Sequence, residues 1–207
     1  MFWSGLSVLL VLPVLTVLHA RLAWGEESSA PASRRVPSRS HDGQIGLAVL
    51  IGDGYRGIFP YDQGRVCGDA TGGESTRVCT NRAPPFVDLR ASFGISRAWD
   101  VLLDVRFGLW PDFTTKRQFF GMPGFRYWLA PQSRVKFFTT IQLAYDRSPQ
   151  NQMGVKDEDL ALRNANGLMV DLTRNLGIYA QLGETIGFLR WLSFLVDGGL
   201  GVEARFP

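Results

Sequence analysis

From residue 43 to the end of the chain, apolar and polar residues alternate with a period of two. In the last stretch, residues 194–206, the even positions are apolar or small, and the odd positions include Asp197, Glu203 and Arg205. Such alternation is typical of a β-strand with one apolar and one polar face. No part of this region approaches the roughly 18 consecutive apolar residues of a transmembrane helix.

The same alternation predicts eight strands. The connections after the second, fourth and sixth strands are short, and those after the first, third and fifth are long or irregular. Pro123 predicts a bulge in the fourth strand, because proline cannot donate to a ladder. In the sixth, Asn164 and Asn166 would share the apolar face unless Gly167 shifts the register. The predicted strands cover about residues 44–52, 87–96, 101–109, 119–129, 135–145, 164–172, 176–182 and 194–206.

The polar face distinguishes a soluble barrel or sandwich from a barrel in a membrane. A soluble barrel would need an outer face rich in Lys and Glu. Here the polar rows are poor in lysine, rich in Gly and Ser, and mixed in charge, which suits a narrow enclosed interior. An arginine facing lipid near the midplane would cost about 2–4 kcal/mol. The expected interior charge network is Asp88, Arg90, Asp104, Arg106, Arg126, Lys136, Asp197, Glu203 and Arg205.

These patterns predict an all-β fold, a closed eight-stranded antiparallel up-and-down transmembrane β-barrel. Aromatic residues near both strand ends are consistent with two membrane girdles, although ordinary core packing is the alternative. The expected girdles are Trp99, Tyr127, Trp128 and Phe206 at the short turns, and Trp110, Phe120, Tyr145 and Trp191 near the long loops.

The first 25 residues have the features of a signal peptide. An apolar run from Leu6 to Leu18 is followed by small residues at Ala23 and Gly25, which predicts cleavage after Gly25. The segment before the run has no Lys or Arg, so an uncleaved membrane anchor is the alternative. Residues 26–42 are rich in Ser, Pro and Arg and predict a flexible periplasmic linker, which leaves 43–207 as the barrel domain.

Cys67 and Cys79 are the two cysteines, and both lie in a Gly-rich, polar stretch. An exported chain meets oxidising conditions, so we expect them to form a disulfide worth about 3 kcal/mol. A metal or redox site is the alternative, but the spacing is wrong and partner ligands are missing. The net charge of +3 is a small excess that does not suggest nucleic-acid binding.

From Gly43 to Pro207 the chain resembles the small outer-membrane β-barrels of the OmpA and OmpX type. The resemblance rests on the signal peptide, the alternating strands, the alternation of short turns with long loops, and a last strand that ends at Phe206. It implies a location in the outer membrane of a Gram-negative bacterium, contact with outer-membrane lipids, and Phe206 as the cue for the assembly machinery. Pro207 makes that aromatic penultimate, a departure from the pattern.

Three classes of function stay open. The charged interior predicts a plugged barrel with a structural or cell-surface role, and a narrow channel for small solutes or ions is the alternative. Barrel enzymes that act on lipid resemble one another in using a histidine at the outer rim, whereas His41 falls in the predicted linker. A mechanism based on Asp157, Glu158 and Asp159 alone competes with a solvated acidic loop.

We therefore expect a monomer that is not an enzyme and that needs no cofactor. The loop that holds Cys67 and Cys79 is the expected place for an extracellular ligand, with a protective cap as the alternative. Asp69 and Glu74 in this loop lack the regular ligand spacing of a calcium site.

Overall fold

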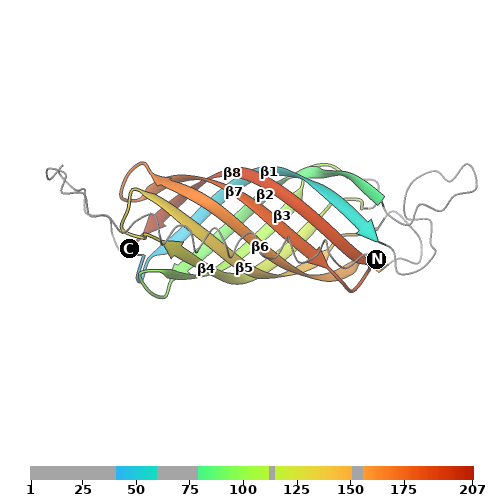
Figure 1. The fold of residues 1–207 in the computed structure, drawn as a ribbon, viewed down its shortest axis with the longest axis horizontal. Helices are drawn as coiled ribbons and strands as arrows, with labels where there is room; N and C mark the ends of the chain where they lie inside the picture. Colours follow the sequence, from blue (N-terminus) through green and yellow to red (C-terminus); the bar gives the residue numbers. More distant parts are fainter. Residues whose placement is uncertain (1–40, 60–78, 112–114, 151–155) are drawn as a thin grey trace, which may run out of the picture. The chain divides into compact units, whose positions relative to one another are not determined.

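The computed structural model describes residues 41–59, 79–111, 115–150 and 156–207. In these ranges eight antiparallel strands close into one barrel in chain order (Figure 1). β1 and β8 complete the closure by pairing from Ile45 with Phe206 to Phe59 with Leu192. The strands are β1 (Ile45–Phe59), β2 (Cys79–Gly94), β3 (Trp99–Gly108), β4 (Phe119–Leu129), β5 (Val135–Arg147), β6 (Glu158–Asp171), β7 (Leu176–Gly187) and β8 (Leu192–Phe206).

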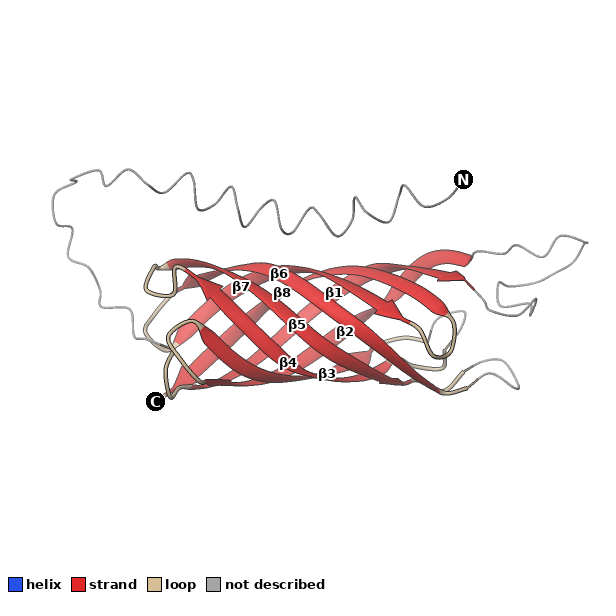
Figure 2. Cartoon of the chain, turned by 60° about the horizontal axis from the view of Figure 1, so that its bottom comes forward, coloured by secondary structure: helices blue, strands red, loops and turns tan. Residues whose placement is uncertain are grey.

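The strands cross the barrel obliquely, and no strand edge is left without a neighbour (Figure 2). Closure matters because an unpaired amide group in hydrocarbon costs several kcal/mol. The connections β2–β3, β4–β5 and β6–β7 lie at one end with Phe206, which we call the short-turn end; the opposite end is the long-loop end. Among the residues that the structure describes, no helix is long and apolar enough to cross a membrane.

The two faces of the wall are divided as the alternation predicts. Leu200, Leu182 and Ile141 point outward and are 73%, 70% and 62% exposed. Charged side chains on the alternate positions are buried inside, for example Arg106 and Asp104. An apolar outside and a polar inside is the reverse of a soluble barrel, and it is the arrangement that lipid requires.

β2 is longer than predicted and begins at Cys79. Pro84 and Pro85 lie opposite the point where the β1–β2 register shifts, between Gly52 and Gly54. The shift accommodates both prolines, and pairing then continues to Ile58 and Cys79. The sequence prediction began this strand at Val87, after the prolines, which instead form part of an irregularity within it.

The predicted bulge at Pro123 is wrong. Gly121 pairs with Tyr145 and Gly124 pairs with Gln142, so the β4–β5 register is the same on both sides of the proline. β6 also keeps one register along its length with both neighbours, and Gly167 does not shift it. Asn166 is consequently exposed on the outer wall.

The aromatic girdles are only partly as expected. Trp99 and Phe206 face outward at the short-turn end, and Trp110 and Tyr145 are exposed at the long-loop end. Trp128, Phe120 and Trp191 were assigned to the girdles wrongly, because all three are buried. Trp128 and Phe120 lie on inward positions of β4, where they take part in two apolar clusters. These are Ala48, Leu50, Phe86, Trp128, Phe138, Met169 and Tyr179, and Phe120, Met122, Ala144 and Ala161.

Candidate functional site

The middle of the barrel interior is held by a carboxylate that two arginines share. Arg106 Nη1 donates to Asp197 Oδ2 at 2.9 Å, and Arg163 donates to both oxygens of Asp197 at 2.5 and 2.7 Å. Arg106 also donates to both oxygens of Asp88, at 2.7 and 2.8 Å, from the opposite position on the neighbouring strand. Four strands, β2, β3, β6 and β8, are thereby joined across the interior.

A second arginine–carboxylate pair lies beside this group, on β2 and β3. Arg90 donates to both oxygens of Asp104 at 2.7 and 2.6 Å, and the two residues face each other across β2 and β3. Its Nη2 also reaches Gln181 Oε1 on β7 at 3.3 Å. The bidentate geometry is the strong form of an arginine–carboxylate contact.

Arg126 organises the interior at the short-turn end. It donates to Asp100 Oδ2 at 2.7 and 2.9 Å and to both oxygens of Glu203 at 2.6 and 3.0 Å. Its guanidinium carbon is 4.3 Å from the centroid of the Trp128 ring, and the indole Nε1 donates to the same Asp100 oxygen. Arg205 Nε donates to Glu203 at 2.8 Å, so each carboxylate here is paired.

His41 is buried at this end of the interior, whereas the prediction placed it in a flexible linker. Its ring stacks on Trp128 with 4.6 Å between centroids, and Lys136 Nζ lies 3.2 Å from its Nε2. The Gly43 amide donates to the Gly94 carbonyl at 2.8 Å, which ties the segment to the end of β2. Burial, followed by the nearby Arg205 and Lys136 cations, lowers the pKa of His41 to about 2.

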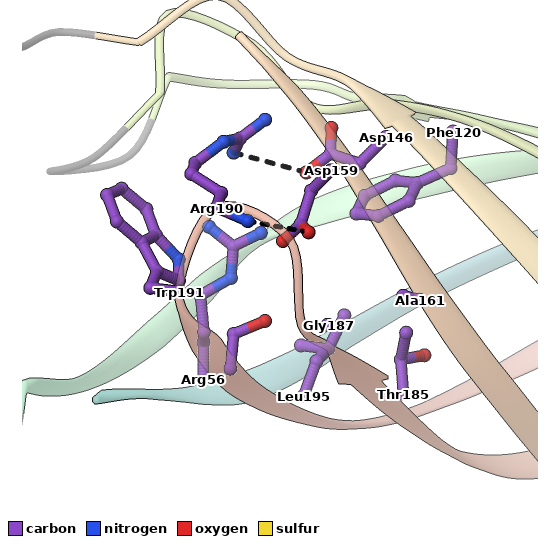
Figure 3. A pocket seen from close by; sticks show the side chains of 11 residues that line it. Arg56, Phe120, Asp146, Asp159, Ala161, Thr185, Gly187, Arg190, Trp191 and Leu195 are labelled. Atoms are coloured by element: carbon purple, nitrogen blue, oxygen red, sulfur yellow. Dashed lines mark hydrogen bonds and ion pairs between the residues drawn. The ribbon is translucent and has the colours of Figure 1, made fainter. Parts of the chain in front are cut away.

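The long-loop end carries another group of charges, drawn in Figure 3. Asp159 Oδ1 accepts the backbone amides of Leu189 and Arg190 at 2.7 and 3.0 Å, which fixes the β7–β8 hairpin. Arg190 Nη1 lies 3.4 Å from Asp146 Oδ2. Burial lowers the pKa of Arg190, and the carboxylates of Asp146 and Asp159 act in the opposite direction. The cavity among these side chains measures about 10 Å³, room for about one water molecule.

The structure brings the predicted interior charges together inside the barrel. All nine lie on inward positions and are buried. Four of them pair across β2 and β3, Arg90 with Asp104 and Arg106 with Asp88. Lys136 Nζ lies 2.7 Å from Oδ2 of Asp171, which belongs to β6.

Sequence reasoning missed several members of the network. Arg163 falls before the predicted start of the sixth strand, although Ala161 and Ala165 flank it at a spacing of two. Asp100 was placed in a turn, and Asp159 in a solvated acidic loop; both are buried on strands. The alternation, extended by a few residues at each strand end, would have found all three.

The remaining predicted residues are only partly described. Cys79 is buried at the start of β2, whereas Cys67, Asp69 and Glu74 lie outside the described residues, so the disulfide stays a prediction. Phe206 ends β8 with an exposed ring, and its role in assembly is not tested by its position. In the described ranges, no three His, Cys, Asp or Glu side chains are grouped as a metal site would require.

No family model and no curated protein matches this sequence. Solved structures with the same fold include Neisserial surface protein A, with a TM-score of 0.56 and 13% identity over 80% of this chain and 100% of that chain. The N-terminal β-barrel domain of Pseudomonas aeruginosa OprF gives 0.54 and 11% over 80% and 98%. Ail, the attachment invasion locus protein of Yersinia pestis, gives 0.51 and 11% over 80% and 99%. The chain therefore has the fold of the small eight-stranded outer-membrane β-barrels, with an outer wall suited to lipid.

Proposed function

We propose that the protein is an integral outer-membrane barrel with a structural or cell-surface role, and that its interior is closed to solutes. The observation that carries this proposal is the sharing of Asp197 between Arg106 and Arg163, which fills the middle of the barrel with paired charge. A small barrel has room for little beyond its own side chains, so a continuous path would require these pairs to separate.

Contacts at both ends of the barrel support a closed interior. At the short-turn end, His41 stacks on Trp128, and Lys136 Nζ lies 3.2 Å from His41 Nε2. At the long-loop end, loops from different strand pairs are bonded to one another: the Lys116 amide donates to the Pro149 carbonyl at 2.8 Å, and Arg190 donates to the Asp157 carbonyl at 2.5 Å. These contacts suit a cap over the barrel.

Conductance in planar bilayers tests the closed interior. We expect no sustained channel steps from the refolded protein, and rare or brief openings from Asp197→Ala, which releases Arg106 and Arg163 from their shared partner. Glu158→Gln, a change at an exposed carboxylate at the start of β6, serves as the control. Steady ion-selective conductance from the unmodified protein would replace this proposal with the narrow channel.

The cell-surface part of the proposal concerns the loop between β1 and β2. These strands pair as far as Ile58 and Cys79, and residues 60–78 connect them at the long-loop end. We place this end outside the cell and the Cys67–Cys79 disulfide in the loop, as the site for an extracellular ligand. Rigid scaffolds commonly present binding loops in this way.

Trypsin treatment of whole cells tests this orientation. We expect cleavage after Arg77, between the two cysteines, with the fragments still joined on a denaturing gel until a reductant is added. Protection of Arg77 in intact cells, with cleavage only after the envelope is opened, would contradict the placement. The disulfide is tested in Arg65→Gln, because Arg65 lies in the same connection outside the Cys67–Cys79 ring and cleavage there would separate the fragments in either case. Separation without reductant in this variant would contradict the disulfide.

The enzyme alternative gains no support from the one histidine in the described part of the chain. His41 is buried against Trp128, and its contacts are with ring and cationic groups rather than with a hydroxyl or carboxylate. Comparison of lipid A from cells with and without the protein tests for activity. We expect identical lipid A species, and a difference that requires the protein would favour an enzyme.

A further inference from the structure

Three polar side chains lie on the outer wall of β6 and β7, with apolar residues before and after them along both strands and Thr139 of β5 directly beside Asn166. Asn166 and Glu184 are exposed and Asn164 is half-buried, and all three occupy outward positions. Asn166 Nδ2 donates to Asn164 Oδ1 at 3.1 Å, and Asn164 faces Glu184 directly across the two strands. We call these three residues the polar island.

Apolar side chains enclose the island on both sides along the strands. Leu162 and Ile186 lie toward the long-loop end, and Leu168 and Leu182 toward the short-turn end, all of them exposed outward. The β7–β8 hairpin beyond Ile186 is itself apolar at its tip, with Phe188 and Leu189 exposed. The island therefore lies within the lipid-facing band and not at its edge.

Glu184 differs from Asp53, another acidic residue on the outer wall. Asp53 on β1 accepts a hydrogen bond from Arg82 Nε at 2.7 Å, so its charge is paired within the chain. No hydrogen bond or ion pair joins the Glu184 carboxylate to another described residue. Hydrocarbon offers no donor, and polar groups inside the membrane usually find partners on other proteins or on adjoining segments.

The island is self-complementary under a two-fold axis. An amide donor on β6 lies directly beside a carboxylate acceptor on β7. If the axis runs along the membrane normal between these strands, Glu184 of one copy faces Asn164 of the other, and the reverse contact forms at the same time. Such reciprocal contacts define a symmetric dimer interface.

The outer wall next to the polar island would also let a second barrel pack closely. Ala180 lies between Leu168 and Leu200 on the neighbouring strands, and the outer surface there forms an apolar groove of about 520 Å³. Leu182 and Leu200 protrude beside it with exposed fractions of 70% and 73%. Protruding and small residues side by side suit packing against another wall.

We infer that the polar island is the contact through which two copies of this barrel pair in the membrane. The inference rests on the proposed function only in requiring a membrane-spanning barrel. It departs from the monomer expected from the sequence. The second copy supplies what lipid lacks at this depth, namely amide donors for Glu184 and an acceptor for Asn164.

Single-molecule photobleaching tests the pairing. The refolded chain, labelled at its amino terminus, is placed in phosphatidylcholine and phosphatidylglycerol vesicles at decreasing protein-to-lipid ratios. We expect two-step bleaching at rates above chance, converting to one-step bleaching on dilution. Asn164→Asp should reduce the two-step fraction at least several-fold, because it sets two carboxylates against each other.

The exchange of both residues provides the decisive control. Asn164→Asp with Glu184→Gln moves the acid to β6 and the amide to β7, and should restore pairing toward the unmodified level. Heat-modified gel migration verifies that each variant is folded, and unchanged bilayer conductance keeps this test separate from that of the closed interior. The inference is overturned by one-step bleaching at all ratios, by full pairing of Asn164→Asp, or by pairing that occurs only when lipopolysaccharide is added, which would assign the island to lipid.

Discussion

At the residue scale, the charges in the middle of the interior and at its short-turn end are paired with partners of opposite sign. A buried carboxylate or guanidinium loses several kcal/mol of hydration, and that loss is recovered only when the geometry of the pair is good. Arg126 satisfies this condition with two carboxylates, Asp100 and Glu203. The interior is thus sensitive to the removal of one partner, since the other charge cannot reach water.

Asp197 should be the most sensitive of these positions. Asp197→Asn removes the charge that Arg106 and Arg163 share, and we expect the free energy of unfolding to fall by about 3–5 kcal/mol. Urea denaturation in detergent micelles measures the change. Glu158→Gln makes the same chemical change at an exposed carboxylate and should stay within about 0.5 kcal/mol. Equal effects of the two substitutions would show that the shared pairing adds little.

His41 should make the docking of the 41–44 segment sensitive to acid. Its folded pKa of about 2 lies below the unfolded value of 6.5, so the undocked state binds more protons between these values. Docking of the 41–44 segment is therefore unaffected above pH 6.5, and it weakens as the pH falls below 6.5. We expect the Gly43 and Gly94 amide resonances to shift toward undocked positions between pH 6.5 and 4.

His41→Phe is the matched variant for this test. It keeps a ring against Trp128 and cannot be protonated, so the same resonances should stay in place over that pH range. If the variant loses the docked resonances at the same pH as the unmodified chain, the carboxylates nearby are responsible, and the role given to His41 is wrong.

At the element scale, the end of β2 and the segment before β1 form one unit. A Cβ at Gly94 would lie 1.7 Å from the His41 carbonyl oxygen, so no larger residue fits while the segment is docked. This requirement could not be read from the alternation, in which Gly94 is one small inward residue among many. It depends on a contact between segments that are far apart in sequence.

Gly94→Ala should therefore release the segment and leave the barrel closed. We expect faster proteolysis near residues 41–44 and an unchanged heat-modified gel shift. Gly121→Ala is the control, because a Cβ there meets nothing within 4 Å. Retention of the docked Gly43 resonance in Gly94→Ala would contradict the packing of His41 described above.

At the scale of the whole molecule, stability comes from closure as much as from the interior. β1 and β8, at opposite ends of the sequence, pair along their full lengths. Because no edge remains, unfolding must break several ladders together. This cooperativity predicts a simple assay.

The detergent-folded protein should migrate differently on a gel before and after boiling. The unboiled sample retains the closed barrel, which binds less detergent than the unfolded chain. Identical migration, together with solubility in the absence of detergent, would indicate a soluble domain and would contradict the membrane assignment. Asp197→Asn should lose its folded band at a lower temperature than the unmodified protein.

The sequence alone determined the strands, their faces and the closed barrel. The reason is that apolar and polar residues alternate along each strand, and this alternation distinguishes the positions that face lipid from those that face the interior. It also placed all nine predicted charges inside. Only the tertiary structure decided which charges pair, since Arg163 and Asp197 come from strands that meet across the interior. Likewise, the burial of His41 and the exposure of Asn166 and Glu184 depend on registers and contacts between distant segments, which no local pattern contains.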